Sequence, residues 1–288
     1  MPILDHSLNF RAGPVGLLLI HALGGTPAEL RSVAMGLAKA GYSVYCPQLP
    51  GHGGSFADLR ATGWRDWYAA VETQHSQLRK ICRRVIVGGL SLGALLALHL
   101  AAKRPSEVHA IVLFAPTLQL DGWGAPWYGV LFRLVRVGWG GDRFPFSERQ
   151  SHAIKDPRLR GLAAGASHGG DSSKIGQLPI PGRVMVEMRW LVNMVQRELH
   201  DIRQPTLIVH HRNDDRTGLR NVTYLQRKLG GLVETCALQD RYRILSLDRQ
   251  RDLVVQRTAA FAARMDALQN RNGEKDLADL ADLLRRSK

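Results

Sequence analysis

The stretch VIVGGLSLGALL, residues 85–96, constrains the fold more than any other part of the chain. It places Gly-X-Ser-X-Gly, with Ser91 at its centre, directly between an apolar strand-like run and an apolar helix-like run. In this layout the serine occupies a strained turn, its hydroxyl projects from the sheet, and the flanking glycines let strand and helix pass closely. The motif alone is common by chance, but its strand-turn-helix context predicts that Ser91 is a nucleophile. We also expect the Ser91 side chain to be accessible to solvent.

Strands and helices alternate from residue 15 to about residue 116. The expected strands are 15–20, 42–46, 84–88 and 109–114, and the expected helices are 26–40, 64–80 and 92–103. The first helix has a start signal, with Thr26 as its cap, Pro27 in the first turn and Glu29 reaching back to the cap. Strands separated by helices predict a parallel sheet with helices on both faces.

The pattern changes at about residue 119, where tryptophans and glycines cluster, and regular alternation resumes after residue 203. We therefore predict an α/β core formed by residues 1–118 and 203–268, with residues 119–202 inserted as a cap or lid. The last strand is expected at 232–238 and the last core helix at 246–265. A polar break beyond Asn270 precedes an apolar stripe at helical spacing, made of Leu277, Leu280, Leu283 and Leu284. Residues 269–288 are therefore expected to form an amphipathic helical tail that docks on its own domain or on a partner subunit, giving a homodimer.

The composition is that of an ordinary globular enzyme, with 45% hydrophobic and 7% aromatic residues in 288. The N-terminal residues lack the basic start and apolar stretch of a signal peptide, and the run 15–20 is too short to span a bilayer. Three widely spaced cysteines predict reduced thiols and a cytoplasmic location. No metal or cofactor is expected.

The formal net charge of +14 is compatible with binding to nucleic acid, anionic membranes or acidic substrates. However, the arginines are scattered along the whole chain, and no nucleic-acid motif accompanies them. We therefore expect a generic basic surface and no specific nucleic-acid partner.

Several segments, in the same order along the chain, resemble the α/β-hydrolase superfamily, and more closely its bacterial carboxylesterase and monoacylglycerol-lipase-like members. HALGGT at 21–26 resembles the family's His-Gly-X-Gly-Gly oxyanion loop, with alanine in place of the first glycine. LPGHGGS at 49–55 resembles its Leu-Pro-Gly-His-Gly segment, and LIVHHRND at 207–214 resembles the strand whose end delivers the triad acid. The resemblance covers residues 15–265. It implies an α/β-hydrolase fold, with a mostly parallel sheet flanked by helices and an inserted cap.

The resemblance also implies roles for individual residues. The backbone N–H groups of Leu23 and Leu92 would face the developing oxyanion, where one such donor contributes roughly 3 kcal/mol. Asp214 is the expected triad acid. His21 and His52 fall near the site, where we favour loop packing and hydrogen bonding as their role.

The base of the triad is missing from its expected place. The family orders its triad Ser, Asp, His, with the histidine on the loop after the last strand. In this chain the position is occupied by Arg243, and the eleven histidines end at His211. Arginine cannot act as a base, because its pKa exceeds about 12. Since losing the histidine of a comparable triad costs about 10⁶ in turnover, we expect ordinary esterase turnover to be poor.

Three interpretations of Arg243 remain open. In the first, another histidine supplies the base, and the histidines considered are His21, His168, His210 and His211. In the second, Arg243 pairs with Asp214 in a salt bridge and fixes a site that binds but scarcely turns over. In the third, the arginine holds an anionic acyl substrate or carrier while Ser91 reacts slowly. Asp215 is the alternative to Asp214, because strand ends are hard to place within one residue, and Arg241 is interpreted as a solvated surface charge.

The leading hypothesis is a carboxylesterase-like or thioesterase-like serine hydrolase of a small-molecule acyl substrate. It would act through Ser91 and be impaired by Arg243. The tryptophan-rich composition of the predicted cap indicates a greasy acyl group. The alternative is a non-catalytic hydrolase-fold protein that binds a ligand or a partner.

Overall fold

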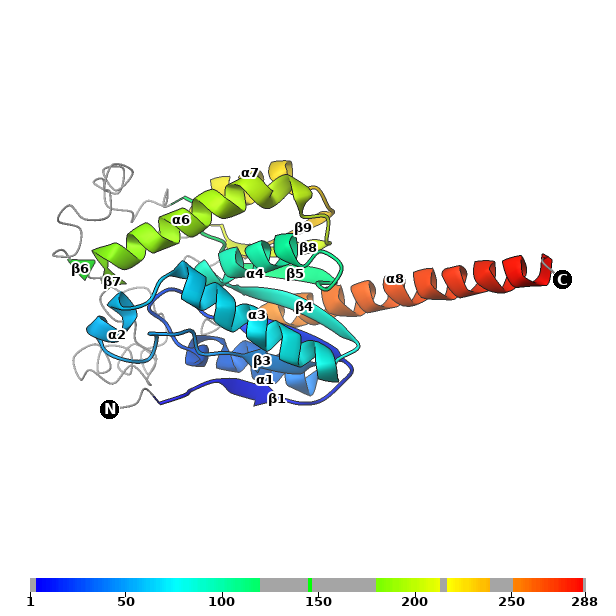
Figure 1. Ribbon diagram of the computed structural model, residues 1–288, viewed down its shortest axis with the longest axis horizontal. Coiled ribbons are helices and arrows are strands. Elements are labelled where there is room, and N and C mark those ends of the chain that lie inside the picture. Colours follow the sequence, from blue (N-terminus) through cyan, green and yellow to red (C-terminus); the bar gives the residue numbers. More distant parts are fainter. Residues whose placement is uncertain (1–3, 120–144, 147–179, 213–216, 239–250, 287–288) are drawn as a thin grey trace.

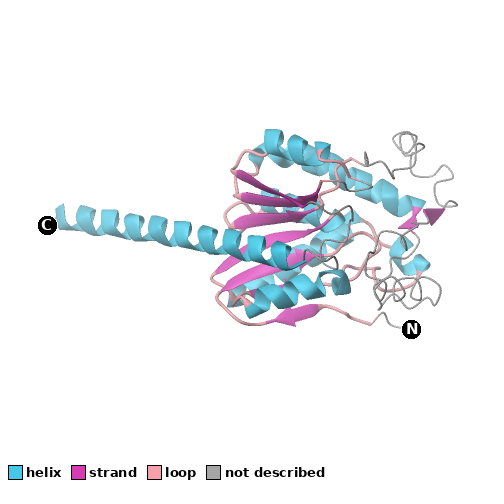
Figure 2. Ribbon diagram, turned by 180° about the vertical axis from the view of Figure 1, so that it is seen from behind, coloured by secondary structure: helices cyan, strands magenta, loops and turns pink. Residues whose placement is uncertain are grey.

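The computed structural model describes residues 4–119, 145–146, 180–212, 217–238 and 251–286. At its centre is a seven-stranded sheet in the order β1-β3-β2-β4-β5-β8-β9 (Figures 1 and 2). β1 pairs antiparallel with β3, and the other neighbouring pairs are parallel, as predicted. The strands of this sheet are β1 (Leu8–Phe10), β2 (Val15–Ile20), β3 (Ser43–Cys46), β4 (Arg84–Leu90), β5 (Ala110–Phe114), β8 (Thr206–His211) and β9 (Val233–Leu238).

Helices cover both faces of the sheet (Figures 1 and 2). On one face lie α3 (Trp64–Ile81), α4 (Leu92–Lys103), α6 (Gly182–Glu198) and α7 (Arg220–Lys228), and on the other lie α1 (Arg31–Lys39) and α8 (Arg251–Arg286). Successive residues of β2 alternate between the two layers. Leu18 and Ile20 pack with the first group of helices, and Leu17 and Leu19 pack with the second. Burial on both faces explains why the sequence of this strand is a continuous apolar run.

The start of the first helix differs from its prediction. The chain forms a short 3₁₀ helix, η1 (Pro27–Leu30), before α1, and the Thr26 side chain makes no capping hydrogen bond. The Glu29 carboxylate does not reach back to the cap but accepts a hydrogen bond from the backbone N–H of Ala22. The predicted capping box is therefore wrong, because a buried backbone donor earlier in the chain takes the carboxylate. α3 and α4, in contrast, begin at the predicted residues.

The predicted end of the last core helix at residue 265 is also wrong. α8 continues through this residue to Arg286, and the Asn270 side chain accepts a hydrogen bond from Arg84 at 2.8 Å. Polar residues do not end a helix by themselves, and a single interior glycine costs only about 1 kcal/mol. In Figures 1 and 2 the C-terminal part of α8 extends away from the sheet, so the described part of this tail, up to Arg286, does not lie on its own domain as expected. Docking of this tail on a partner subunit stays a prediction.

Much of the predicted cap, residues 119–202, lies outside the described residues. Its described parts include a two-stranded antiparallel sheet made of β6 (Pro145–Phe146) and β7 (Ile180–Pro181). α6 also belongs to this segment, and its buried residues Leu191 and Val195 join the same apolar cluster as α4. The C-terminal part of the predicted cap therefore packs directly on the helical layer of the core. The cap boundaries themselves stay a prediction.

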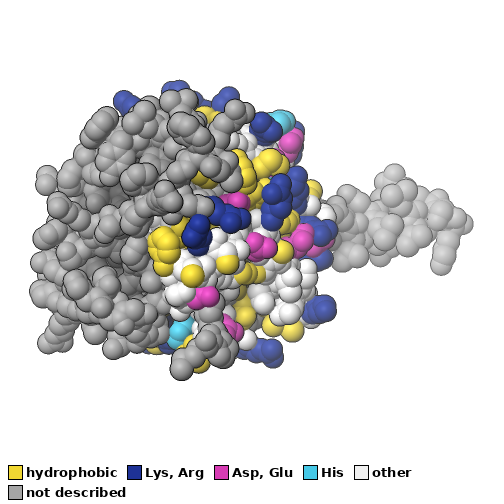
Figure 3. Space-filling view, turned by 60° about the vertical axis from the view of Figure 1, so that its left-hand side comes forward, with side chains coloured by type: hydrophobic (Ala, Val, Ile, Leu, Met, Phe, Trp, Pro, Cys, Tyr) yellow, Lys and Arg dark blue, Asp and Glu magenta, His cyan; other side chains and the backbone are white. Residues whose placement is uncertain are grey.

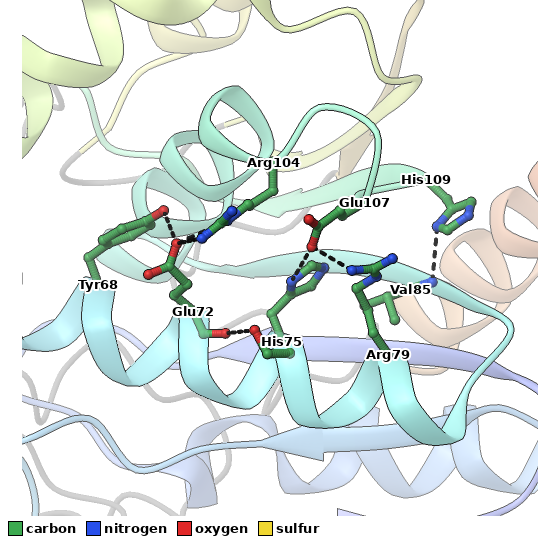
Figure 4. A network of polar contacts seen from close by, with 9 residues as sticks. Tyr68, Glu72, His75, Arg79, Val85, Arg104, Glu107 and His109 are labelled. Atoms are coloured by element: carbon green, nitrogen blue, oxygen red, sulfur yellow. Dashed lines mark hydrogen bonds and ion pairs between the residues drawn. The ribbon is translucent and has the colours of Figure 1, made fainter.

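Polar contacts fasten α3 to the end of α4 and the turn that follows it (Figure 4). Arg104 donates to Glu72 at 2.8 Å, and Arg79 pairs with Glu107 at 2.7 Å. The buried His75 lies 4.0 Å from the same Glu107 carboxylate, and burial is the largest influence on its pKa, which is lowered. Because the Arg104 and Arg79 side chains are about half exposed, each ion pair contributes little, up to about 1 kcal/mol.

The charged side chains of the described residues can be seen on one face of the molecule. On the face in Figure 3, Lys and Arg side chains are interspersed with acidic and apolar ones. Helices long and apolar enough to cross a membrane are not found among the described residues. All three cysteines, Cys46, Cys82 and Cys236, are free thiols, as expected.

Candidate functional site

Ser91 forms the sharp turn between β4 and α4. Its backbone has φ 54° and ψ −106°, a conformation that non-glycine residues rarely adopt and that persists only where the surroundings impose it. Two backbone hydrogen bonds do so here. The Ser91 N–H donates to the Phe114 carbonyl at 3.0 Å, and the Ala94 N–H donates to the Ser91 carbonyl at 3.2 Å. The predicted strand-turn-helix geometry is therefore confirmed, while the role of Ser91 as a nucleophile stays a prediction.

The flanking glycines permit close packing at this turn. A Cβ on Gly89 would lie 2.4 Å from the Ile20 carbonyl oxygen, and one on Gly93 would lie 2.1 Å from the same oxygen and 2.9 Å from the His21 oxygen. Real Cβ atoms do not approach other heavy atoms this closely, so alanine does not fit at either position without a shift of its neighbours. The first turn of α4 is thus pressed against the end of β2 and the residue that follows it. The sharp turn formed by residues 89–93, called the elbow below, therefore touches the predicted oxyanion loop.

The Ser91 hydroxyl is hydrogen-bonded to a threonine in the segment that follows β5. Its Oγ lies 2.9 Å from Oγ1 of Thr117, which also donates to the Ala115 carbonyl at 3.2 Å. Since a threonine hydroxyl has one proton, the bond to Ala115 leaves Thr117 as the acceptor for Ser91. Asn221 on α7 holds this segment, because its Oδ1 accepts from the two N–H groups after Thr117, both at 2.9 Å.

The expected solvent accessibility of Ser91 is wrong, since the residue is only 4% exposed. Its hydroxyl is turned toward Thr117, and the elbow is packed against the end of β2. Thr117 is also a residue that sequence reasoning missed. Nothing in the local sequence marks it, and only the pairing of β4 with β5 brings it beside Ser91.

The segment after β2 forms a tight turn with Leu23 and Gly24 in the middle. The Gly25 N–H donates to the Ala22 carbonyl at 3.1 Å, and Gly24 has φ 70°, the positive value that a type II turn requires at this position. The turn does not use the Leu23 N–H. Leu92 is the first residue of α4, so its N–H has no acceptor within the helix. Both predicted oxyanion donors therefore lie on elements that touch, and their role stays a prediction.

His21 and His52 are buried structural residues, as we favoured. His21 Nε2 accepts from the Leu49 N–H at 3.1 Å, so Nδ1 carries the proton and donates to the Ala22 carbonyl at 2.8 Å. Burial, with a smaller contribution from nearby His52, lowers the pKa of His21 to about 3. The ring centroids of the two histidines are 4.9 Å apart. Because both nitrogens of His21 are engaged, His21 is not available as the missing base.

The histidines at the end of β8 are also buried. His210 Nδ1 donates to the His211 carbonyl at 2.8 Å, which leaves Nε2 to accept from the Thr217 hydroxyl at 3.3 Å. His211 is fully buried and makes contacts of its own. His210 therefore uses both ring nitrogens within the fold, and His168 lies outside the described residues.

Glu29 is a further residue that sequence reasoning assigned to the wrong partner. Its side chain is buried, and Oε2 accepts from the Ala22 N–H at 3.1 Å. A Cβ on Gly25 would lie 2.3 Å from the same oxygen, so the carboxylate fills the space beside the turn. The one sequence signal for this role is an acidic residue next to a glycine-rich turn, and the same signal also fits a helix cap.

Asp214, Asp215, Arg241 and Arg243 lie outside the described residues, so their predicted roles and the pairing of Arg243 with Asp214 stay predictions. The described strands that precede them are adjacent. β8 pairs parallel with β9, and the Arg212 N–H donates to the Leu238 carbonyl at 2.8 Å. The carboxyl ends of β8 and β9 therefore lie on the same side of the sheet as the carboxyl end of β4, because these strands are parallel to β4 through β5.

Comparison with known proteins agrees with this geometry. The chain is 27% identical over 266 residues to the thermostable monoacylglycerol lipase of Bacillus sp. (strain H-257), covering 91% of this chain and 97% of that protein. It is 23% identical over 264 residues to a carboxylesterase of Bacillus subtilis (strain 168), covering 90% of this chain and 96% of that one.

A solved structure from the metagenome-derived lipolytic enzymes LipS and LipT superposes with a TM-score of 0.75 at 24% identity, covering 90% of this chain and 97% of that chain. At this identity the likeness establishes the fold alone. The sequence pattern described as "Alpha/beta hydrolase family" matches residues 17–270. With its sheet order, its serine turn and this match over most of its length, the chain belongs to the alpha/beta hydrolase family.

Proposed function

We propose that the protein is a carboxylesterase-like or thioesterase-like serine hydrolase that attacks a small-molecule acyl ester through Ser91. The observation that carries the proposal is the strained backbone of Ser91, with φ 54° at the start of α4. Strain of this kind is retained where it serves a reactive group. The names of the two Bacillus relatives, a monoacylglycerol lipase and a carboxylesterase, support the same reaction class.

In the proposed reaction, Ser91 Oγ attacks the acyl carbonyl and the carbonyl oxygen becomes an oxyanion. The N–H groups of Leu23 and Leu92 would donate to that oxygen, and the positive end of the α4 dipole would stabilise it further. Asp214 would be the triad acid. These groups would lower the barrier for attack on the acyl carbon, but none of them removes the proton from the Ser91 hydroxyl.

Proton transfer is the weak step of the proposed mechanism. Arg243 stands at the predicted position of the triad histidine and cannot accept a proton near neutral pH. The described partner of the Ser91 hydroxyl is Thr117, a neutral hydroxyl without the basicity of an imidazole. We therefore propose slow turnover, in which the oxyanion donors and binding retain a rate about 10³–10⁴ times the uncatalysed rate.

The test combines fluorophosphonate labelling with hydrolysis of short p-nitrophenyl esters. We expect slow labelling of the wild-type protein that is abolished in Ser91→Ala. We expect Arg243→His to raise ester hydrolysis by orders of magnitude, because it restores an imidazole at the predicted triad position. Arg241→His is the matched control, since it makes the same chemical change two residues away. An equal response from both variants would show that the alignment of the triad is wrong.

A second function, a non-catalytic protein that binds a ligand or partner on a hydrolase fold, is favoured by one specific observation. The Ser91 hydroxyl is bonded to Thr117, and His21 and His210 have both ring nitrogens engaged within the fold. Labelling that does not depend on Ser91, together with an inactive Arg243→His variant, would favour this alternative. Rapid labelling lost in Ser91→Ala would exclude it.

A further inference from the structure

The turn that carries Leu23 is supported from within by a buried carboxylate. Glu29 lies in η1 and is only 4% exposed, and its Oε2 accepts the Ala22 N–H at 3.1 Å. A buried carboxylate is costly unless hydrogen bonds compensate its lost hydration. Its place beside this turn therefore needs a structural or functional reason.

Glu29 contacts both ends of the turn. It binds the Ala22 N–H at one end, and at the other end it lies so close to Gly25 that a Cβ there would be 2.3 Å from Oε2 and 2.4 Å from Cδ. Gly25 in turn donates to the Ala22 carbonyl at 3.1 Å and closes the turn. The carboxylate thus occupies the space that would otherwise allow the two ends to move.

The hydrogen bonds of Ala22 determine where the Leu23 N–H points. Glu29 holds the peptide before Ala22 through its N–H, and the Ala22 carbonyl accepts both from His21 Nδ1 at 2.8 Å and from the Gly25 N–H. That carbonyl belongs to the same peptide unit as the Leu23 N–H. Two consecutive peptide planes are therefore fixed, and donors to the carbonyl also polarise the N–H of its peptide.

The turn lies directly against the elbow. β2 pairs with β4 so that Ile20 is opposite Gly89, and Gly93 is packed on the backbone of Ile20 and His21. Resting on the proposed hydrolase function, we propose that Glu29 is a positioning residue, whose carboxylate locks the Ala22–Gly25 turn so that the Leu23 N–H faces the oxyanion formed at Ser91. Glu29 does not touch the substrate in this role.

The test compares Glu29→Ala with Glu29→Gln, which keeps an oxygen acceptor, and with Gly25→Ala, which displaces the flexible end of Glu29 without removing it. The first measurement is amide hydrogen exchange of the turn. We expect exchange at Ala22 to accelerate at least about tenfold in Glu29→Ala and Gly25→Ala, because the N–H loses its buried acceptor, and to stay near the wild-type rate in Glu29→Gln.

The second measurement is the kinetics of fluorophosphonate labelling at Ser91. Removing one oxyanion donor typically costs about 10²–10³, so displacing one should lower the maximal labelling rate at least about tenfold in Glu29→Ala. The concentration for half-maximal labelling should change little, since Glu29 does not contact the reagent. Recovery of the rate in Glu29→Gln would distinguish positioning from a requirement for charge.

Glu187 provides a matched control. It is another buried glutamate whose Oε2 accepts a backbone N–H, that of Trp64 at 3.3 Å, and a Cβ on Gly63 would lie 2.8 Å from it. Glu187→Ala should lower stability without slowing the labelling. If exchange at Ala22 is unchanged in both Glu29→Ala and Gly25→Ala, or if labelling in Glu29→Ala slows no more than in Glu187→Ala, the positioning role is overturned. Failure of the proposed function is a separate result, since it would appear as labelling that does not depend on Ser91.

Discussion

Replacing Gly93 by alanine should separate the oxyanion geometry from the stability of the fold. A Cβ at this position would lie 2.1 Å from the Ile20 carbonyl oxygen and 2.6 Å from its carbon. Atoms in a close-packed interior do not approach this far, so the gap must open by about 1 Å. Either the first turn of α4 or the end of β2 has to move. Both movements displace the Leu23 turn relative to Ser91.

Two opposing contributions determine the change in stability of Gly93→Ala, and one geometric effect determines the change in its labelling rate. Overpacking a core costs about 1–3 kcal/mol, and the higher helix propensity of alanine returns up to about 1 kcal/mol. We therefore expect Gly93→Ala to lose about 0–3 kcal/mol of unfolding free energy. A shift of about 1 Å between reacting groups costs about 10²-fold in rate, so labelling of Ser91 should slow by about that factor.

The assay measures urea unfolding and the rate of fluorophosphonate labelling on the same preparation. Gly231→Ala is the matched control, because its Cβ would lie 2.3 Å from the Arg203 carbonyl oxygen. Gly231 comes just before β9, at the amino ends of the parallel strands, whereas Ser91 lies at their carboxyl ends. The control variant should lose similar stability and label at the wild-type rate. Wild-type labelling in a destabilised Gly93→Ala, or equal slowing in both variants, would refute the reasoning.

Two further predictions concern the surroundings of Ser91 and the buried histidines. Thr117→Val should accelerate labelling of Ser91 about two- to tenfold, because a hydrogen bond worth about 0.5–1.5 kcal/mol no longer holds the Ser91 hydroxyl. Thr117→Ser keeps the hydroxyl and should label at the wild-type rate. Slower labelling of the valine variant would contradict this prediction. Burial lowers the pKa of His21 to about 3 and that of His52 to about 4, so between about pH 4 and the ordinary value near 6.5 the unfolded chain binds more protons than the folded one. The unfolding free energy should therefore fall as the pH is lowered from about 6.5, by up to about 1.4 kcal/mol per pH unit for each histidine, and a flat profile in urea titrations at pH 7, 6 and 5 would count against it.

The elements that the sequence predicted best are those governed by short-range sterics. α4 runs from Leu92 to Lys103, the predicted bounds, and Ser91 has the predicted strained turn before it. Glycine is required at positions 89 and 93 because a Cβ at either position would collide with the Ile20 carbonyl oxygen. Parallel pairing was predicted from the alternation of strands and helices, and burial of β2 on both faces was predicted from its continuous apolar run.

Contacts between distant elements could not be predicted in the same way. Thr117 meets Ser91 because β5 lies beside β4, and Asn221 reaches the same segment from α7. No local pattern marks either residue. The Glu29 prediction was wrong for a related reason, since a glutamate three residues after a threonine fits a cap equally well. The buried N–H of Ala22, visible only in three dimensions, decides which donor takes the carboxylate.

The two halves of the proposed site depend on the sequence to different degrees. The proposed oxyanion stabilisation would use backbone N–H groups, which every residue except proline has, and we expect their direction to depend on the sterics at Gly93 and on Glu29. Proton transfer depends on one side chain, and at neutral pH an arginine cannot substitute for a histidine. A single replacement at the predicted triad position, 243, would therefore remove the base and leave the backbone donors in place. The family match over residues 17–270 establishes the family, whereas the proposed slow hydrolysis would depend on that one side chain.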